Sequence, residues 1–153
     1  MNRFMGQAIE LAAASVRAGG GPFAALVVKD GSVVATGVNQ VVRAHDPTAH
    51  AEIVAIREAC RALGDFQLTG CDVYASCEPC PMCLGALYWA RPARIFFAAT
   101  RDDAAAAGFD DALIYREILA ALPQRTIPTI HLPHDRAARP FEEWTAKPDK
   151  TRY

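Results

Sequence analysis

Two short fragments of the sequence carry side chains that can bind a metal ion: His50-Ala51-Glu52 and Pro79-Cys80-Pro81-Met82-Cys83. One imidazole and two thiolates fill three positions of a tetrahedral zinc ion and leave the fourth for water, which is the layout of a catalytic site. Both fragments are expected at helix N-termini, where unpaired amides and the helix dipole favour thiolate over thiol. The spacing therefore predicts a catalytic zinc site held by His50, Cys80 and Cys83.

Glu52 follows the histidine by two residues. In the first turn of a helix, both side chains can reach an ion that lies beyond the helix end. Zinc lowers the pKa of bound water from about 15.7 to about 7, which makes hydroxide available as a nucleophile at neutral pH. Glu52 is then expected to accept the displaced proton and to return it to a reacting group.

Each of these residues has an ordinary explanation when it is taken alone: a surface histidine, a first-turn helix acid or a small buried thiol. The conjunction of the two fragments favours zinc. Cys77 is a competing ligand, because Cys77-x-x-Cys80 has the same spacing as Cys80-x-x-Cys83, although the prolines on both sides of Cys80 favour the later pair. We assign Cys60 and Cys71 to packing, and no partner pattern makes the other three histidines ligands.

The totals describe one packed domain over residues 1–153, of which 52% are hydrophobic and 22% charged. The net charge of -1 offers no strong field for phosphate backbones, so nucleic acid is not expected as the main partner. No apolar run approaches the length of a membrane span. Five cysteines, an odd number, suit metal binding in a reducing compartment, and the cytoplasm is the expected location.

The elements that must position the metal fragments alternate between strands and helices. Asp30-Gly31 predicts a tight hairpin turn between the first two strands. Strands that helices separate are normally parallel, and helices then cover both faces of the sheet. We therefore expect an α/β fold, a three-layer α/β/α sandwich with a five-stranded mixed sheet. The expected strands are Phe23–Val28, Ser32–Val38, Asp72–Ser76, Arg94–Ala98 and Thr126–Leu132, and helices are expected near 4–16, after Asp46-Pro47-Thr48, from Pro81, and near 111–122 and 136–146.

Three segments outside the bare metal ligands carry a family resemblance: 46–52, 76–86 together with Trp89, and 103–111. The first two contain the H-x-E and P-C-x-x-C signature of zinc deaminases. Together the segments resemble small bacterial guanine deaminases of the cytidine deaminase-like zinc deaminase superfamily. The metal motifs are shared with cytosine, adenosine and riboflavin-pathway deaminases, whereas Gly108-Phe109-Asp110-Asp111 is more particular. The resemblance implies a cytidine deaminase-like fold, one zinc ion per subunit and hydrolysis of guanine to xanthine and ammonia.

The same resemblance implies how guanine would be held. Asn39 and the Ala51 backbone would contact the base, and Phe23 and Trp89 would line the pocket. Asp111 would bind the N1 and amino edge, where a carboxylate can accept two parallel hydrogen bonds from two donors. Adenine presents an acceptor and a donor at that edge, so one lone pair would face another.

The resemblance also implies a homodimer, in which the C-terminal segment 133–153 is exchanged and Tyr153 closes the pocket of the neighbouring subunit. Ordinary roles stay open for several of these residues. Phe23 and Trp89 can be core residues, and Asn39 can simply shape a turn. Asp111 can be a helix cap, with Asp110 as the base ligand instead, and Tyr153 can be a disordered end.

Two other classes of function remain as alternatives. The nearer one is a deaminase of another aminated purine or nucleoside, such as guanosine or tRNA adenosine. The weak net charge disfavours tRNA, because phosphate contacts supply most of such binding. The remoter alternative is a non-catalytic structural zinc protein, which would need a fourth protein ligand, with Cys77 as the candidate.

Overall fold

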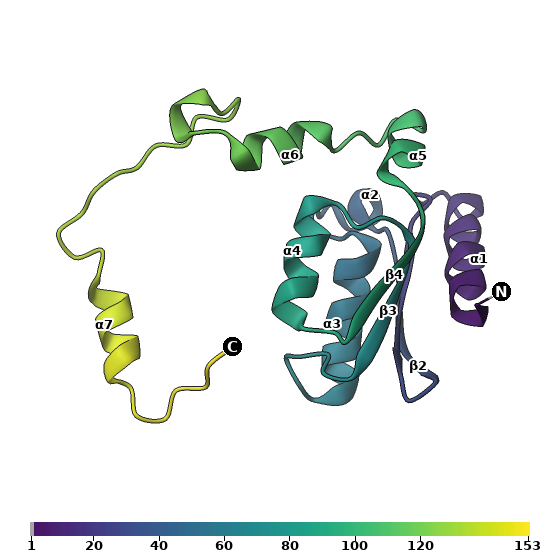
Figure 1. The fold of residues 1–153 in the computed structure, drawn as a ribbon, viewed down its shortest axis with the longest axis horizontal. Helices are drawn as coiled ribbons and strands as arrows, with labels where there is room; N and C mark the ends of the chain where they lie inside the picture. The colour runs from purple at the N-terminus through teal and green to yellow at the C-terminus, as the bar shows by residue number, and fades with distance from the viewer. Residues whose placement is uncertain (1) are drawn as a thin grey trace. The chain divides into compact units, whose positions relative to one another are not determined.

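The computed structural model describes residues 2–153 and divides into two compact units, a first that ends at Ala112 and a second over Leu113–Tyr153 (Figure 1). The first unit contains the sheet. Its strands are β1 (Ala24–Lys29), β2 (Ser32–Val38), β3 (Cys71–Cys77) and β4 (Arg94–Ala99), in the order β2-β1-β3-β4. β1 is antiparallel to both neighbours, while β3 and β4 are parallel. The expected mixed sheet is confirmed, with four strands in the described residues rather than five.

The hairpin between β1 and β2 turns at the predicted pair of residues. Asp30 has φ 49° and Gly31 has φ 72°, so two consecutive residues adopt the left-handed conformation. Such a pair matches the right-handed twist of the flanking strands, and a two-residue turn therefore connects them tightly.

Helices cover both faces of the sheet, as expected (Figure 1). α1 (Arg3–Arg17) packs on one face through Ala8, beside Leu26, Val28 and Tyr74. α3 (Ala51–Leu63) and α4 (Pro81–Ala90) cover the other face. Alternate residues of a strand point to opposite faces. β1 accordingly sends Leu26 and Val28 to the first layer, and Ala25 and Val27 to the second.

The helices that carry the metal fragments begin close to the predicted positions. α4 begins at Pro81, as expected for proline in a first turn. α3 begins at Ala51 with His50 as its N-cap residue, later than the predicted start at Asp46-Pro47-Thr48. The carboxylate of Asp46 instead accepts hydrogen bonds from the backbone N–H and the hydroxyl of Thr48, which forms a turn before the helix.

Two short helices of the first unit were not predicted: α2 (Val41–Ala44) and α5 (Arg101–Ala106). α5 begins with a capping box, in which the Thr100 hydroxyl accepts from the backbone N–H of Asp103 and the Asp103 carboxylate accepts from the backbone N–H of Thr100. A threonine followed three residues later by an acid indicates such a start in the sequence.

The second unit contains α6 (Ala112–Leu119, whose first residue ends the first unit), a 3-10 turn η1 (Leu122–Gln124) and α7 (Arg139–Ala146). α6 and α7 are shorter than the helices predicted near 111–122 and 136–146. No described helix is long and apolar enough to cross a membrane.

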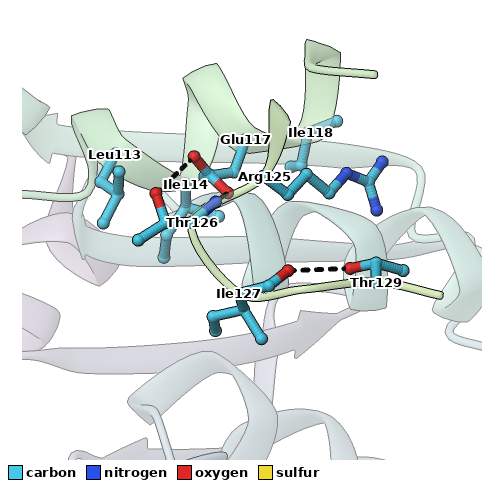
Figure 2. A pocket seen from close by; sticks show the side chains of 8 residues that line it. All are labelled: Leu113, Ile114, Glu117, Ile118, Arg125, Thr126, Ile127 and Thr129. Atoms are coloured by element: carbon cyan, nitrogen blue, oxygen red, sulfur yellow. Dashed lines mark hydrogen bonds between the residues drawn. The ribbon is translucent and has the colours of Figure 1, made fainter. Parts of the chain in front are cut away.

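The predicted fifth strand at Thr126–Leu132 is wrong, because this segment joins no sheet in the described structure. The Glu117 carboxylate accepts hydrogen bonds from the backbone N–H of Thr126, at 2.8 Å, and from its hydroxyl, at 2.9 Å (Figure 2). Pro128 has no N–H to donate to a ladder. The backbone N–H of Thr126 is therefore engaged by Glu117 and Pro128 has none, and the segment has no strand partner in the described structure.

Candidate metal centre and active site

The predicted zinc ligands come together at the N-termini of two helices. His50 is the N-cap residue of α3, Cys80 is the N-cap residue of α4, and Cys83 lies in the first turn of α4. Each cysteine sulfur lies 3.5 Å from His50 Nδ1. The three ligand atoms all lie within 4.8 Å of one another.

These separations fit a tetrahedral zinc ion. With Zn–N of about 2.0–2.1 Å and Zn–S of about 2.3 Å, tetrahedral angles place the nitrogen about 3.5–3.6 Å from each sulfur. Of the histidine, cysteine, aspartate and glutamate side chains in residues 2–153, only His50, Cys80 and Cys83 form such a cluster. Three protein ligands leave a fourth position for water or substrate, which distinguishes a catalytic zinc site from a closed structural one.

Without a metal ion, the cluster holds protons that zinc would displace. Hydrogen bonds from the Cys83 thiol and from His50 lower the pKa of Cys80 to about 4. The pKa of His50 is raised, first by its hydrogen bond to Cys80. The pKa of Cys83 is raised because its proton bonds to Cys80 and because the thiol is buried. Zinc binds the thiolate and neutral imidazole forms, so binding must release these protons.

Glu52 lies in the first turn of α3, two residues after the histidine ligand, and only 8% of its surface is exposed. Burial is the main cause that raises its pKa above the ordinary value. A carboxyl group with a raised pKa holds a proton more readily than an ordinary one and can therefore both accept and return it. Glu52 also stands outside the group of metal-ligating atoms, which leaves it available for proton transfer.

Cys77, the competing ligand, is directed elsewhere. It ends β3, and its sulfur lies 3.5 Å from the backbone oxygen of Thr100. Burial raises the pKa of its thiol, which favours the neutral form over the thiolate that binds metal. Cys71 lies in the hydrophobic core and Cys60 packs against it, as their assignment to packing predicted.

A cleft of about 670 Å³ opens beside His50. Asn39 lines it, and the Asn39 side-chain oxygen also accepts a hydrogen bond from the backbone N–H of Val41 at 3.2 Å. The residue therefore shapes the turn after β2 and faces the cleft at once. Gly21, Arg43 and Phe109 are further lining residues.

The aromatic residues differ in their relation to this cleft. Phe23 packs edge-to-face against Phe109, with ring centroids 4.9 Å apart, and is not itself among the described residues that line the cleft. Phe109 itself was not predicted as a site residue, although it lies in the most particular segment of the sequence. Trp89 is 67% exposed and is not among the described residues that line the cleft. It lies nine residues after Cys80, about 13 Å along α4. Its pocket role stays a prediction.

Of the two adjacent aspartates, Asp110 has a structural role. Its carboxylate accepts a hydrogen bond of 2.8 Å from the backbone N–H of Ala112, at the start of α6. The pKa of Asp111 is raised, first by burial and then by the negative charge of Cys80. Because Asp110 is engaged at the start of α6, Asp111 is the aspartate of the pair whose role as a ligand for substrate stays a prediction.

Ala51 and Tyr153 are the last two residues predicted to contact substrate. Ala51 is the first residue of α3 and is almost fully buried beside the metal cluster. Tyr153 belongs to the second unit, where its ring packs edge-to-face near Trp144 with centroids 6.3 Å apart, and it is 72% exposed. Its contact with a neighbouring subunit stays a prediction.

Comparison with known proteins agrees with this geometry. A family model described as the cytidine and deoxycytidylate deaminase zinc-binding region matches residues 1–99. A guanine deaminase of Bacillus subtilis (strain 168) is 52% identical over 151 residues, which are 98% of this chain and 97% of the relative. A tRNA-specific adenosine deaminase of Aquifex aeolicus (strain VF5) is 45% identical over 78 residues, 51% of this chain and 52% of the relative.

Solved structures show the same relation. The crystal structure of a guanine deaminase from Bacillus subtilis matches with a TM-score of 0.97 at 51% identity, over 100% of this chain and 99% of that chain. A guanine deaminase structure from Nitrosomonas europaea matches with a TM-score of 0.67 at 38% identity, over 71% and 63%. Since the family model spans more than half of the chain and includes every residue of the metal cluster, the chain belongs to the zinc-binding cytidine and deoxycytidylate deaminase family.

Proposed function

We propose that this protein hydrolyses guanine to xanthine and ammonia, with residues 1–153 acting as one deaminase domain. The observation that carries the proposal is the cluster of His50, Cys80 and Cys83 at two helix N-termini, with the buried Glu52 two residues after the histidine. Asp111, whose neighbour Asp110 is bonded to the start of α6, would supply the acceptor for a base edge that presents two donors. The extended similarity to a guanine deaminase, over 98% of this chain, supports the same substrate.

The reaction assigns a task to each residue of the site. His50, Cys80 and Cys83 would hold zinc, and the metal when bound supplies a water acidic enough to attack carbon at neutral pH. Glu52 accepts the proton that this water loses and gives it to the neighbouring ring nitrogen; it then takes the proton of the hydroxyl added to C2 and gives it to the leaving amine. Water adds to C2 of guanine, the bond from C2 to the amine breaks, and xanthine and ammonia leave.

Base selectivity would come from Asp111. Its carboxylate accepts from guanine N1–H and from the amino group, which are both donors. Adenine places an N1 lone pair against the same oxygen, so the repulsion disfavours it. Asn39 and the Ala51 backbone would contact the base, and Phe23 would line the pocket together with the Phe109 ring that it packs against. Trp89 would line the pocket as well.

The assembly that we propose is a cytoplasmic homodimer, in which residues 133–153 are exchanged and Tyr153 closes the pocket of the neighbour. The second unit leaves many large apolar side chains exposed, and its own pocket of about 450 Å³ is lined by such residues (Figure 2). Monomeric proteins rarely expose contiguous apolar surface of this kind. A second copy of the chain would cover it. The most exposed of these side chains are Leu119, Leu132, Ile130 and Ile127.

The second candidate is deamination of a nucleoside, guanosine above all, because its base presents the same N1 and amino edge to Asp111 as guanine does. Deamination of tRNA adenosine is less favoured, because the chain has a net charge of -1. A structural zinc protein is the least favoured, because Cys77 is directed at Thr100 and not at the metal cluster.

The test is ammonia release by the zinc-loaded protein from guanine, guanosine, adenine, adenosine, cytosine and cytidine, with wild type and Asp111→Asn assayed side by side. We expect release from guanine alone in the wild type. Asp111→Asn loses a charge-assisted acceptor, so its kcat/KM for guanine should fall by about 10- to 150-fold. Release from another member of the panel, or none at all, would overturn the assignment of substrate.

A further inference from the structure

The loop that leads into the zinc cysteines is tied to the chain just before and inside α5 by three contacts. The backbone N–H of Glu78 donates to the oxygen of Ala99 at 2.8 Å. A Glu78 carboxylate oxygen accepts from the backbone N–H of Arg101 at 3.1 Å. The Cys77 sulfur lies 3.5 Å from the oxygen of Thr100. Cys77 and Glu78, which precede the metal ligand Cys80, therefore contact three consecutive residues, 99–101, that are more than twenty positions away in the sequence.

The glutamate carboxylate satisfies a donor that α5 cannot satisfy itself. The first N–H groups of a helix have no partner within the helix, and a negative charge is favourable there. The capping box engages the N–H groups of Thr100 and Asp103. The N–H of Arg101 lies between them and donates to the carboxylate of Glu78, which belongs to the loop before α4, residues 78–80, here called the metal loop.

α5 in turn sets the path of the segment that meets substrate. At its end, the N–H groups of Gly108 and Phe109 donate to the oxygens of Ala105 and Ala104, both at 2.9 Å. Gly108 has φ 92°, a conformation that glycine adopts without strain. The Phe109 ring then packs against Phe23. The orientation of α5 therefore determines the position of Phe109, which follows the helix, and of Asp111 two residues later.

We propose that Glu78 is a positioning residue, which braces α5 against the metal loop and so sets the distance between the zinc ligands and the base-binding segment Phe109–Asp111. Its effect on guanine binding rests on the proposed function, but its effect on the structure of α5 does not. Removing the brace leaves His50, Cys80 and Cys83 in place. The loss of the brace makes Phe109, in the wall of the cleft, and Asp111, the acceptor for the base edge, more mobile.

The test compares Glu78→Ala and Glu78→Gln with Glu58→Ala as a matched control. Glu58 is an exposed residue of α3 that pairs with Arg61, so the control also removes one exposed carboxylate from an ion pair or hydrogen bond. Zinc content, kcat and KM for guanine, and backbone hydrogen exchange by mass spectrometry are measured for each variant. Glutamine keeps an oxygen that can accept from Arg101, so it should restore most of what alanine removes.

For Glu78→Ala, we expect one zinc per chain, a rise in KM of roughly tenfold with kcat changed by less than about threefold, and faster exchange over 101–109. Glu78→Gln and Glu58→Ala should resemble the wild type in exchange. Unchanged exchange and KM in Glu78→Ala would overturn the proposal, as would loss of zinc. If the wild type does not act on guanine, the proposed function fails, while exchange over 101–109 still decides whether Glu78 braces α5.

Discussion

Gly37 of β2 sits where the sheet approaches α3 most closely, and replacing it with alanine tests how the site is held. A Cβ at this position would lie 2.2 Å from the oxygen of Ala51 and 2.5 Å from the nitrogen of Ala55. Ordinary contacts begin near 3.4 Å, so the strand and the helix would have to separate by roughly 1 Å. Both contacted atoms belong to the backbone, so no side-chain rotation can relieve the clash.

The displaced helix is the one that carries His50 at its N-cap and Glu52 in its first turn. Overpacking of a core costs about 1–3 kcal/mol, and a rigid backbone clash belongs at the upper end. About 3 kcal/mol would lower Tm by about 6–12 °C in a chain of this length. A shift of about 1 Å at the catalytic groups would also lower kcat by about 100-fold.

Thermal unfolding by circular dichroism and steady-state deamination of guanine measure the two effects of Gly37→Ala. Gly6→Ala is the matched control, because a Cβ on Gly6 of α1 would meet nothing within 4 Å. Alanine within a helix should stabilise the control by roughly 0.5–1 kcal/mol with unchanged kcat. If Gly37→Ala had the Tm and kcat of the wild type, the close contact between β2 and α3 would not be what holds His50 and Glu52 in position.

Two further predictions concern pH and metal binding. The pKa values of Glu52 and Asp111 are both raised, first by burial, so each carboxylate loses its charge on acidification at a higher pH than an ordinary acid, and kcat/KM for guanine should fall on the acid side; a pH profile that stays flat down to the ordinary carboxyl range would contradict this. Cys77→Ala should keep one zinc per chain and Cys83→Ala should lose it, as measured by elemental analysis; zinc loss from Cys77→Ala would make Cys77 a ligand.

The metal cluster could be predicted from the sequence because zinc chemistry fixes both the residue types and their local spacing. Helix N-termini present His50, Cys80 and Cys83 without help from distant residues, and Pro81 marks the start of α4. The hairpin turn was predictable for the same local reason, since few residues other than glycine, asparagine and aspartate adopt positive φ readily.

Features that depend on distant partners were not predictable in this way. A strand at Thr126–Leu132 needs a neighbour and free backbone donors, whereas Glu117 and Pro128 remove them. Two adjacent aspartates before a helix look alike in sequence, and only the bond from the N–H of Ala112 shows which one serves the helix. Phe109 gave no periodic signal, because its contact with Phe23 joins residues far apart in the chain.

The capping box of α5 is a different case, because its signal was present. Thr100 and Asp103 have the spacing of a helix start, and the helix is only six residues long. Short helices without a long apolar face are weakly marked by periodicity. The bracing contact from Glu78 adds a partner that no local pattern contains.

The most direct test of the account is zinc content and guanine turnover in Glu52→Gln. Glutamine has nearly the same shape but cannot accept and return a proton as a carboxylate does. We expect one zinc per chain, as in the wild type, and a fall in kcat of about 10² to 10⁴-fold. A Glu52→Gln protein that turns over guanine at close to the wild-type rate would contradict Glu52 as the proton carrier, and one that loses its zinc would make Glu52 part of the metal site.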